Sequence, residues 1–198
     1  MSAMGLPDGY TALPPGKLAA VVTYLEMRAP GPLPPVSSRF DIRLVPRPDL
    51  GWYRDLFRRV GEDWLWFSRL RMSDGELAAI VHDAAVDVFA LRTEGGDEGL
   101  LELDRRDLPN VELAFLGVAA KVIQQGAGRA LMRTALEHAW RPGTERFWVH
   151  TCSLDHPRAL GFYIQAGFTP YKRAIEVFDD PRRTGDLPVT AAPQIPLL

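Results

Sequence analysis

The stretch that decides the fold is Val111–Trp140, VELAFLGVAAKVIQQGAGRALMRTALEHAW. It begins with an apolar run, Val111–Val118, that holds one carboxylate, Glu112, and predicts a strand. A glycine-containing turn, Gln124–Gly128, follows and opens directly into a helical pattern. The first N–H groups of a helix lack intrahelical acceptors and carry partial positive charge, so small residues at this point suit a phosphate or pyrophosphate. A glycine pair is weak support by itself, and the flanking elements must decide what the turn does.

Size and composition limit the class of protein. A chain of 198 residues is long enough for one well-packed domain and short for two. The formal charge of -2 gives no global electrostatic footprint for nucleic acid, and the apolar runs are far shorter than the roughly 20 residues of a membrane helix. Met1–Gly16 lacks the features of a signal peptide, and the single Cys152 excludes an internal disulfide or a multi-cysteine metal site. We therefore expect a cytoplasmic protein without nucleic-acid or membrane partners.

Proline and glycine mark the expected limits of the domain. Residues 1–16 are rich in both and predict a loose N-terminal segment. Residues 17–178 are expected to form a single domain. Residues 179–198 contain several prolines and no periodic pattern, which predicts a tail to which the sequence assigns no role.

Alternating and β-branched apolar runs predict the strands. The expected strands are Lys17–Met27, Arg39–Val45, Val86–Arg92, Gly99–Asp104, Val111–Val118, Arg146–Cys152 and Phe168–Phe178, the last interrupted near Pro170. The turn-like segment 94–97 joins two of these into a hairpin, so three consecutive strands should form an antiparallel meander. The helix between Val118 and Arg146 then makes a crossover whose two strands should be parallel and right-handed.

Helical spacing predicts the helices before the meander. Apolar residues in Asp49–Arg71 follow this spacing, with Gly61 dividing the segment into two short helices. Ser73 and Glu76 match a capping box for a third helix, which His82 should cap at its end. The segment also holds aromatic residues that either wedge the core or wall a ligand pocket. These are Trp52, Trp64, Trp66 and Phe67.

Two further helices are expected after the glycine turn. The first should end at Pro142-Gly143 and bury the stripe Ala127, Leu131, Met132, Ala135, Leu136, Ala139 and Trp140. The second should be capped by Asp155 or His156 and end at Gly167. Its expected buried face is Ala159, Leu160, Phe162, Tyr163 and Ala166.

Three features now stand in a telling order: the strand carboxylate Glu112, the turn Gln124–Gly128, and a helix with Tyr163 that ends at Gly167-Phe168. This order resembles the GNAT superfamily of acyl-CoA-dependent N-acetyltransferases. In that family a strand E-x-x-x-x-x-V leads into [Q/R]-x-x-G-x-[G/A] and a helix, and N-x-x-A-x-x-x-Y-x-x-x-G-F comes later. Here Glu112 to Val118 matches the first motif and His156 to Phe168 the last. The likeness covers roughly residues 40–178.

The resemblance implies an α/β (α+β) fold, with a mixed, mainly antiparallel sheet flanked by helices and one parallel strand-helix-strand crossover around the CoA loop. It implies acetyl-CoA as co-substrate, no metal, and direct attack by a primary amine of a small molecule or peptide in a ternary complex. A homodimer is the assembly that the family suggests. The implied cofactor-binding residues are Leu116, Gly117, Val118, Gln124, Gln125, Gly126, Ala127, Gly128, Arg129, His156 and Tyr163.

The loop fits the family motif in two registers. With Gly126 as the first motif glycine, Ile123 stands where Gln or Arg is expected. With Gly128 in that place, Gln125 fits but the buried stripe of the helix loses its phase. We favour the first register, because it keeps the buried stripe of the helix and the spacing from Glu112 to Val118 together. The departure at Ile123 should cost little function, because a pyrophosphate would be held mainly by backbone N–H groups that any small residue can present. His156 replaces the family's Asn, which weakens the expected side-chain contact to the cofactor there.

The resemblance also implies catalytic roles. An amine acceptor is largely protonated near neutral pH, so a general base must remove a proton, and Glu112 is the candidate. Glu102 is the alternative base, because a carboxylate between two strand leucines faces the side opposite to them. Tyr163 can give a proton to the departing thiolate as general acid.

Strand parity adds a geometric expectation. It places Glu112 on the same face as Ala114, Leu116 and Val118. The backbone at Val118 is the point where the family implies contact with the pantetheine arm, and an N–H there could stabilise the oxyanion.

Two residues of the strand Arg146–Cys152 have alternative interpretations. His150 is either a satisfied buried histidine or an acid–base group beside the cofactor cleft. Cys152 is either a small buried residue or a covalent acyl carrier, which would need an exposed and activated thiol.

The function also has alternatives. A non-catalytic acyl-CoA-binding sensor module would use the same loop without transferring an acyl group. A nucleotide-phosphate-binding protein is disfavoured, because the loop lacks the Gly-Lys-[Ser/Thr] ending of a P-loop.

Overall fold

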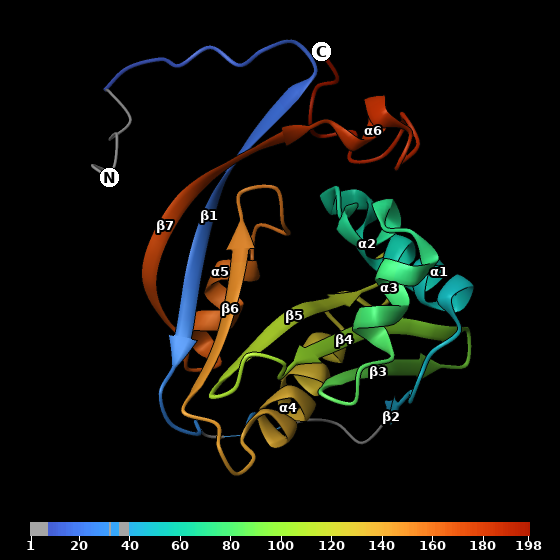
Figure 1. The fold of residues 1–198 in the computed structure, drawn as a ribbon, viewed down its shortest axis with the longest axis vertical. Coiled ribbons are helices and arrows are strands. Elements are labelled where there is room, and N and C mark those ends of the chain that lie inside the picture. Colours follow the sequence, from blue (N-terminus) through green and yellow to red (C-terminus); the bar gives the residue numbers. More distant parts are fainter. Residues whose placement is uncertain (1–7, 32, 36–39) are drawn as a thin grey trace.

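One seven-stranded sheet, in the order β2-β3-β4-β5-β6-β1-β7, organises the chain (Figure 1). The structure is a computed structural model and describes residues 8–31, 33–35 and 40–198. Part of the expected loose segment 1–16 and the start of the expected strand at Arg39 lie outside these residues. The strands are β1 Lys17–Met27, β2 Asp41–Leu44, β3 Val86–Thr93, β4 Gly96–Asp104, β5 Asn110–Val118, β6 Arg146–Cys152 and β7 Thr169–Asp179. The helical elements are α1 Leu50–Gly61, η1 Glu62–Trp64, α2 Ser68–Arg71, α3 Asp74–Val81, η2 Ala120–Val122, α4 Ala127–Ala139, α5 Ala159–Gln165 and α6 Pro181–Thr184.

The sheet is mixed and mainly antiparallel, as the sequence predicts. Adjacent strands run antiparallel except β5 and β6, which are parallel and connected through α4. These two strands pair only between Asn110–Glu112 and Arg146–Trp148. Beyond Glu112 they diverge, and the sheet splits into a β2-β3-β4-β5 half and a β6-β1-β7 half (Figure 1).

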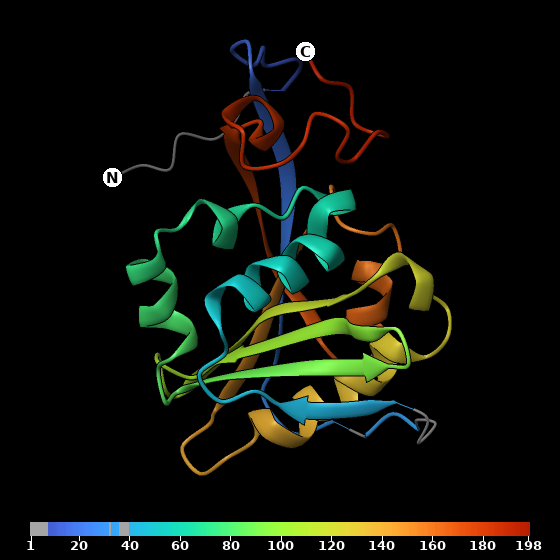
Figure 2. The ribbon, with the colours of Figure 1, turned by 90° about the vertical axis from the view of Figure 1, so that its right-hand side faces the viewer.

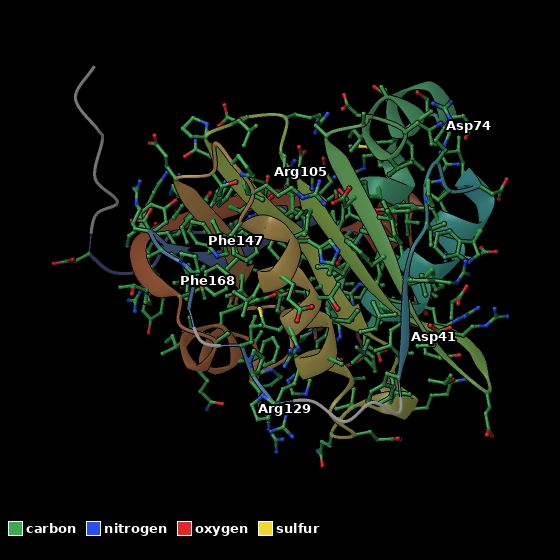
Figure 3. All side chains as sticks on the ribbon, turned by 90° about the horizontal axis from the view of Figure 1, so that it is seen from below. Asp41, Asp74, Arg105, Arg129, Phe147 and Phe168 are labelled. Carbon is green, nitrogen blue, oxygen red and sulfur yellow. The ribbon has the colours of Figure 1, made fainter. Side chains whose placement is uncertain are left out.

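Helices cover the two faces of the sheet unequally. The helices α1, α2 and α3 lie over the β3-β4-β5 half on one face, and α4 and α5 lie on the other (Figures 1 and 2). The core beneath α4 includes Leu131, Phe147 and Phe168, which are at most 2% exposed. Phe147 and Phe168 lie side by side (Figure 3), with ring centroids 5.1 Å apart. Burying a side chain of this size contributes about 1.5–3 kcal/mol.

Local signals in the sequence predict several helix ends correctly. The α1 helix ends at Gly61. The capping box is present: the Ser73 hydroxyl accepts from the Glu76 N–H at 3.3 Å, and the Glu76 carboxylate accepts from the Ser73 N–H at 2.9 Å. His82 is the C-cap of α3. The stripe of α4 is buried from Ala127 to Ala139, with Trp140 partly buried against the same core.

The last helix differs from its prediction. Neither Asp155 nor His156 caps α5, whose N-cap is Arg158 without a side-chain hydrogen bond. The Asp155 carboxylate instead accepts hydrogen bonds from the Thr151 hydroxyl at 2.7 Å, the Cys152 N–H at 2.8 Å and the indole N–H of Trp66 at 3.0 Å. Leu160, expected to be buried, is 36% exposed, because only part of this short helix faces the sheet.

The final strand also differs in detail. The strand β7 is continuous from Thr169 to Asp179, and the irregularity expected at Pro170 is a bulge. Leu25 pairs with Pro170 while Tyr24 pairs with Lys172, so Tyr171 is the extra residue. The chain after β7 folds back toward α2 and packs there (Figure 2). In the part of the chain that the structure describes, no helix has both the length and the apolar character needed to cross a membrane.

Candidate active site

A cleft with a volume of about 1010 Å³ lies where β5 and β6 diverge. Beyond Glu112, no described strand pairs with the β5 edge that faces β6, so backbone N–H and C=O groups of this edge are available to a ligand. The cleft is lined by β5 from Glu112 to Val118, by the turn before α4, and by α5. Its other walls include residues 64–69 and several side chains of β6 and β7. The cleft is therefore bounded by the unpaired edge of β5 and by helical segments from both sides of the sheet.

The helical start at one end of the cleft suits an anion. Gly126 is the N-cap of α4 with φ +90°, and a Cβ there would strain the backbone although it would meet no neighbouring atom. The helix amides that follow point their partial positive charge toward this end. Arg129 is exposed and points away from the domain (Figure 3). A glycine N-cap, 13 residues of helix and a nearby cation fit the pyrophosphate of acetyl-CoA.

Most of the predicted cofactor-binding residues lie at the cleft. The residues that line it are Leu116, Gly117, Val118, Gln124, Gly126, Gly128, Arg129, His156 and Tyr163. Gln125 and Ala127 do not line it. The Gln125 side chain donates to the Lys121 carbonyl at 2.7 Å. Ala127, the first residue of α4, faces the core and is 1% exposed. Gly126 directly precedes the first helical residue of α4.

The parity expected for Glu112 is wrong, because β5 contains a bulge. Glu102 pairs with Phe115 and Leu103 pairs with Leu113, so Ala114 is an extra residue. After Ala114, alternate side chains therefore point to the opposite side of the sheet from the one that simple parity predicts. Val118 packs toward the core beneath α4, whereas Phe115 packs toward α1. Glu112 therefore lies on the α1 side and not on the face of Leu116 and Val118.

The bulge places the Glu112 side chain beside His150. Oε1 of Glu112 lies 3.6 Å from Nδ1 of His150, which is too long for a hydrogen bond but close enough for electrostatic attraction. The His150 side chain is 45% exposed and lines the cleft, so it is not the satisfied buried histidine that we considered. Its interaction with the Glu112 carboxylate raises the pKa of His150 above the ordinary value. Alternation along β6 could have predicted this position, since Phe147 and Val149 take the buried face.

Tyr163 enters the cleft from α5. It is 7% exposed and packs against Phe162 and Phe168, with ring centroids 5.6 and 5.9 Å away. Burial raises the pKa of the Tyr163 hydroxyl well above its ordinary value, and the negative charge of Asp155 adds to this. The hydroxyl is therefore neutral at physiological pH and retains a proton to donate.

Glu102, the alternative base, lies away from the cleft. It faces the side opposite to its flanking leucines, as predicted, and is 0% exposed. The Tyr53 hydroxyl donates to one of its carboxylate oxygens and the Arg69 guanidinium to the other. Burial alone would lower the pKa of Arg69, but attraction to Glu102 outweighs it and raises that pKa. Both carboxylate oxygens of Glu102 are therefore occupied by buried partners, which favours a structural role.

Cys152 lines the cleft but is not activated. Burial raises the pKa of its thiol to about 11, with the nearby Asp155 carboxylate contributing. Because the nucleophile would be the thiolate, this environment does not suit an acyl carrier. Among the described residues, no group of three or more His, Cys, Asp and Glu side chains is placed to hold a metal ion.

Aromatic residues between α1 and α2 form another wall of the cleft. Trp64, Trp66 and Phe67 line it, whereas Trp52 donates its indole N–H to Asp97 at 2.9 Å away from the cleft. Trp66 also lies across β5, because a Cβ at Gly117 would come within 2.9 Å of its ring. The two interpretations of these aromatics thus both apply: Trp66 packs against the core and walls the cleft.

A mixed sheet that splits at its single parallel pair, with a glycine turn and helix start beside the split, defines the class of fold that the sequence motifs resemble. A family model described as the acetyltransferase (GNAT) family matches residues 45–168. The match spans more than half of the chain, so the chain belongs to the GNAT acetyltransferase family. Membership supports acetyl transfer as the general reaction, with acetyl-CoA as the family's usual acetyl donor.

Solved structures share the fold. An aminoglycoside acetyltransferase from an uncultured soil metagenomic sample has a TM-score of 0.55 and 21% identity, covering 70% of this chain and 93% of that one. An IAA acetyltransferase from Bacillus cereus ATCC 14579 has a TM-score of 0.52 and 20% identity, covering 67% and 79%. A functionally unknown conserved protein from Staphylococcus epidermidis ATCC 12228 has a TM-score of 0.56 and 12% identity, covering 83% of this chain and 63% of that one. Identities this low show the fold alone. No curated protein matches the chain.

Proposed function

We propose that the protein transfers the acetyl group of acetyl-CoA to a primary amine by direct attack in a ternary complex. The observation that carries this proposal is the arrangement of Glu112 and Tyr163, which line one cleft from the two faces of the split sheet. A carboxylate and a neutral hydroxyl on opposite sides of one cleft can remove and supply the two protons that acyl transfer to an amine requires.

Glu112 is the proposed general base. It accepts a proton from the ammonium of the acceptor, directly or through water, and His150 lies beside it to hold the carboxylate in place. The nitrogen is then free to attack the thioester, which the open edge of β5 near Val118 would align through its backbone groups.

Tyr163 is the proposed general acid. Its hydroxyl is protonated when the thiolate forms, and the raised pKa makes it a weaker acid than an ordinary tyrosine. Transfer of that proton releases CoA as a thiol, and the second proton, which the attacking nitrogen must lose as the amide forms, returns to the Tyr163 oxygen. The turn Gln124–Gly128, Arg129 and His156 are proposed to hold the phosphate-bearing part of the same co-substrate.

The acceptor is proposed to be an amine of a small molecule or peptide bound against the aromatic wall. Trp64, Trp66 and Phe67 offer flat apolar surface to the body of such a molecule, and Glu112 lies at the same side of the sheet as this wall. The homodimer that the family suggests and the cytoplasmic location both stay predictions.

The experiment that tests the function combines binding and turnover. Calorimetry should show that acetyl-CoA binds and that ATP does not. Release of CoA is then followed with a panel of amines: spermidine, tyramine, kanamycin, lysine and an alanyl peptide. Binding of ATP without a response to acetyl-CoA would exclude the proposal, and acetyl-CoA binding without turnover of any amine would favour the sensor module.

The variant Tyr163→Phe separates an enzyme from a sensor. We expect kcat to fall by about 10²- to 10⁴-fold, because the thiolate would leave without a positioned proton donor. The Kd for acetyl-CoA should be nearly unchanged, since the ring and its packing remain. Turnover at the wild-type rate would remove Tyr163 from the mechanism.

A further inference from the structure

The C-terminal segment 180–196 packs directly behind the aromatic wall of the cleft. Leu65 is 3% exposed and lies in a small core with tail residues that are at most 3% exposed, separate from the two main cores. These tail residues are Leu187, Ala191 and Ala192. Figures 1 and 2 show the tail folding back against α2 from the end of β7. The family match ends at residue 168, so this segment lies outside the matched part of the chain.

Polar contacts join the tail to both ends of the segment that forms the wall. The Asp186 carboxylate accepts from Nη2 and Nε of Arg71 at 2.7 and 3.0 Å. The Gln194 side chain donates to the Asp63 carbonyl at 2.7 Å. The Arg71 guanidinium also lies 4.4 Å from the ring centroid of Phe67, which lines the cleft. The tail thus holds residues on both sides of Trp64–Arg69.

The tail is itself a folded unit. Arg182 is 4% exposed and donates to both carboxylate oxygens of Asp180. It also donates to the Ile195 carbonyl at 2.7 Å and the Ala191 carbonyl at 3.3 Å. One buried guanidinium therefore closes the segment on itself, so the tail can act as a rigid support.

The wall has little regular structure of its own. It consists of the three-residue η1, the four-residue α2 and the link between them. Leu65 in this link has φ +56°, a left-handed conformation that costs a non-glycine residue about 1–2 kcal/mol. Such a conformation persists where surrounding packing holds it, and the fully buried residues that pack with Leu65 all come from the tail. Partly buried side chains complete this core, among them Leu18 and Leu154.

We propose that residues 180–196 are a buttress that sets the shape of the acceptor side of the cleft and thereby the affinity for the amine acceptor. We expect acetyl-CoA binding to depend on this buttress less than acceptor binding does, because the glycine turn and α5 do not contribute to the Leu65 core. The wall reaches the proposed acetyl-CoA site where the Trp64 ring centroid lies 5.1 Å from that of His156 and where Trp66 lies against Gly117. The inference rests on the proposed function for what the wall binds. The support that the tail gives to the wall is a property of the chain that can be measured without an acceptor.

The test uses the full chain with Leu187→Ala, which empties the Leu65 core, and Asp186→Asn, which removes the ion pair without creating a cavity. Val189→Ala is the matched control, since Val189 belongs to the same segment and is 67% exposed. Hydrogen exchange followed by mass spectrometry reports on residues 62–71. Calorimetry reports acetyl-CoA binding, and steady-state kinetics use the amine of the panel that the wild type turns over fastest.

We expect Leu187→Ala to speed exchange across residues 62–71 and to raise KM for the amine about fivefold or more while kcat and the Kd for acetyl-CoA stay within about twofold. Asp186→Asn should shift the same quantities in the same direction by less. Leu187→Met should keep KM near the wild-type value, because methionine fills nearly the same volume as leucine. Val189→Ala should change nothing.

Unchanged exchange in residues 62–71 of both folded variants would overturn the buttress, and faster exchange with an unchanged KM would overturn its effect on acceptor affinity. If the wild type turns over no amine, the proposed function fails while exchange still decides whether the tail supports the wall. A loss of acetyl-CoA affinity equal to the loss of amine affinity would also overturn the proposal, because it would indicate a general loosening of the fold.

Discussion

The ion pair between Glu112 and His150 should make the activity of the proposed base depend on whether His150 is protonated. Attraction to the carboxylate raises the pKa of His150, so the imidazolium persists to a higher pH than for a free histidine. A protonated His150 attracts the Glu112 carboxylate and so competes for it with the ammonium of the acceptor. The rate, measured as kcat/KM, should therefore rise as the pH passes upward through the pKa of His150.

A titration at the residue scale tests this coupling. In Glu112→Gln the negative charge is lost, so we expect the pKa of His150 to fall, as followed by NMR of the imidazole. The chain has four histidines, and the imidazole resonances of His138, which is bonded to the Thr134 carbonyl at 2.9 Å on α4, serve as the internal control because they should not respond to the substitution. A His150 titration that is the same in both proteins would show that the 3.6 Å approach carries no coupling.

At the scale of one element, the two glycines that flank α4 allow an effect on fold stability to be distinguished from an effect on acetyl-CoA binding. Gly126 precedes the helix with φ +90° and Gly143 follows it with φ +94°, and a Cβ at either position meets no atom within 4 Å. An alanine at either position therefore costs similar backbone strain, about 1–2 kcal/mol. Only Gly126 lines the cleft.

We expect Gly126→Ala and Gly143→Ala to lower the free energy of unfolding by similar amounts, measured by urea denaturation. Only Gly126→Ala should weaken acetyl-CoA binding, by about tenfold in calorimetry, since a relaxed turn would move the amides that face the anion. Equal loss of affinity in both variants would mean that the turn acts through helix stability and does not contact the co-substrate.

At the scale of the whole molecule, one buried charge cluster joins distant parts of the chain. The Asp87 carboxylate on β3 accepts from both terminal nitrogens of Arg105, at 2.6 and 3.0 Å, and from Arg141 after α4 at 2.8 Å. Asp87 and Arg105 are 8% and 7% exposed. Removing the shared acceptor would leave a buried guanidinium without its partner.

We therefore expect Asp87→Ala to destabilise the fold by about 3–5 kcal/mol in urea denaturation. Asp55→Ala is the control: its carboxylate pairs with Arg58 at 3.3 Å on the surface of α1, where such a pair contributes about 0–1 kcal/mol. A cost for Asp87→Ala as small as that of the control would show that water replaces the lost carboxylate.

The sequence alone determined the features that depend on neighbouring residues. The alternating runs, the capping box at Ser73 and the buried stripe that begins at Ala127 predict strands and helices in the order in which they occur. The glycine turn before α4 and its place beside a parallel strand pair were predicted with them. These signals act over one or two turns of chain, so a pattern can specify them.

The tertiary structure decided the features that depend on pairing between distant segments. The side of the sheet on which Glu112 lies follows from the bulge at Ala114, which is set by how β4 and β5 pair. The packing of the tail follows from contacts such as Arg71 with Asp186, which are 115 residues apart. A tail without periodicity carries no local signal for such a contact. Only the tertiary structure determined the side of the sheet on which a side chain lies and the segments against which the tail packs. Strand register and packing depend on contacts between residues far apart in the sequence.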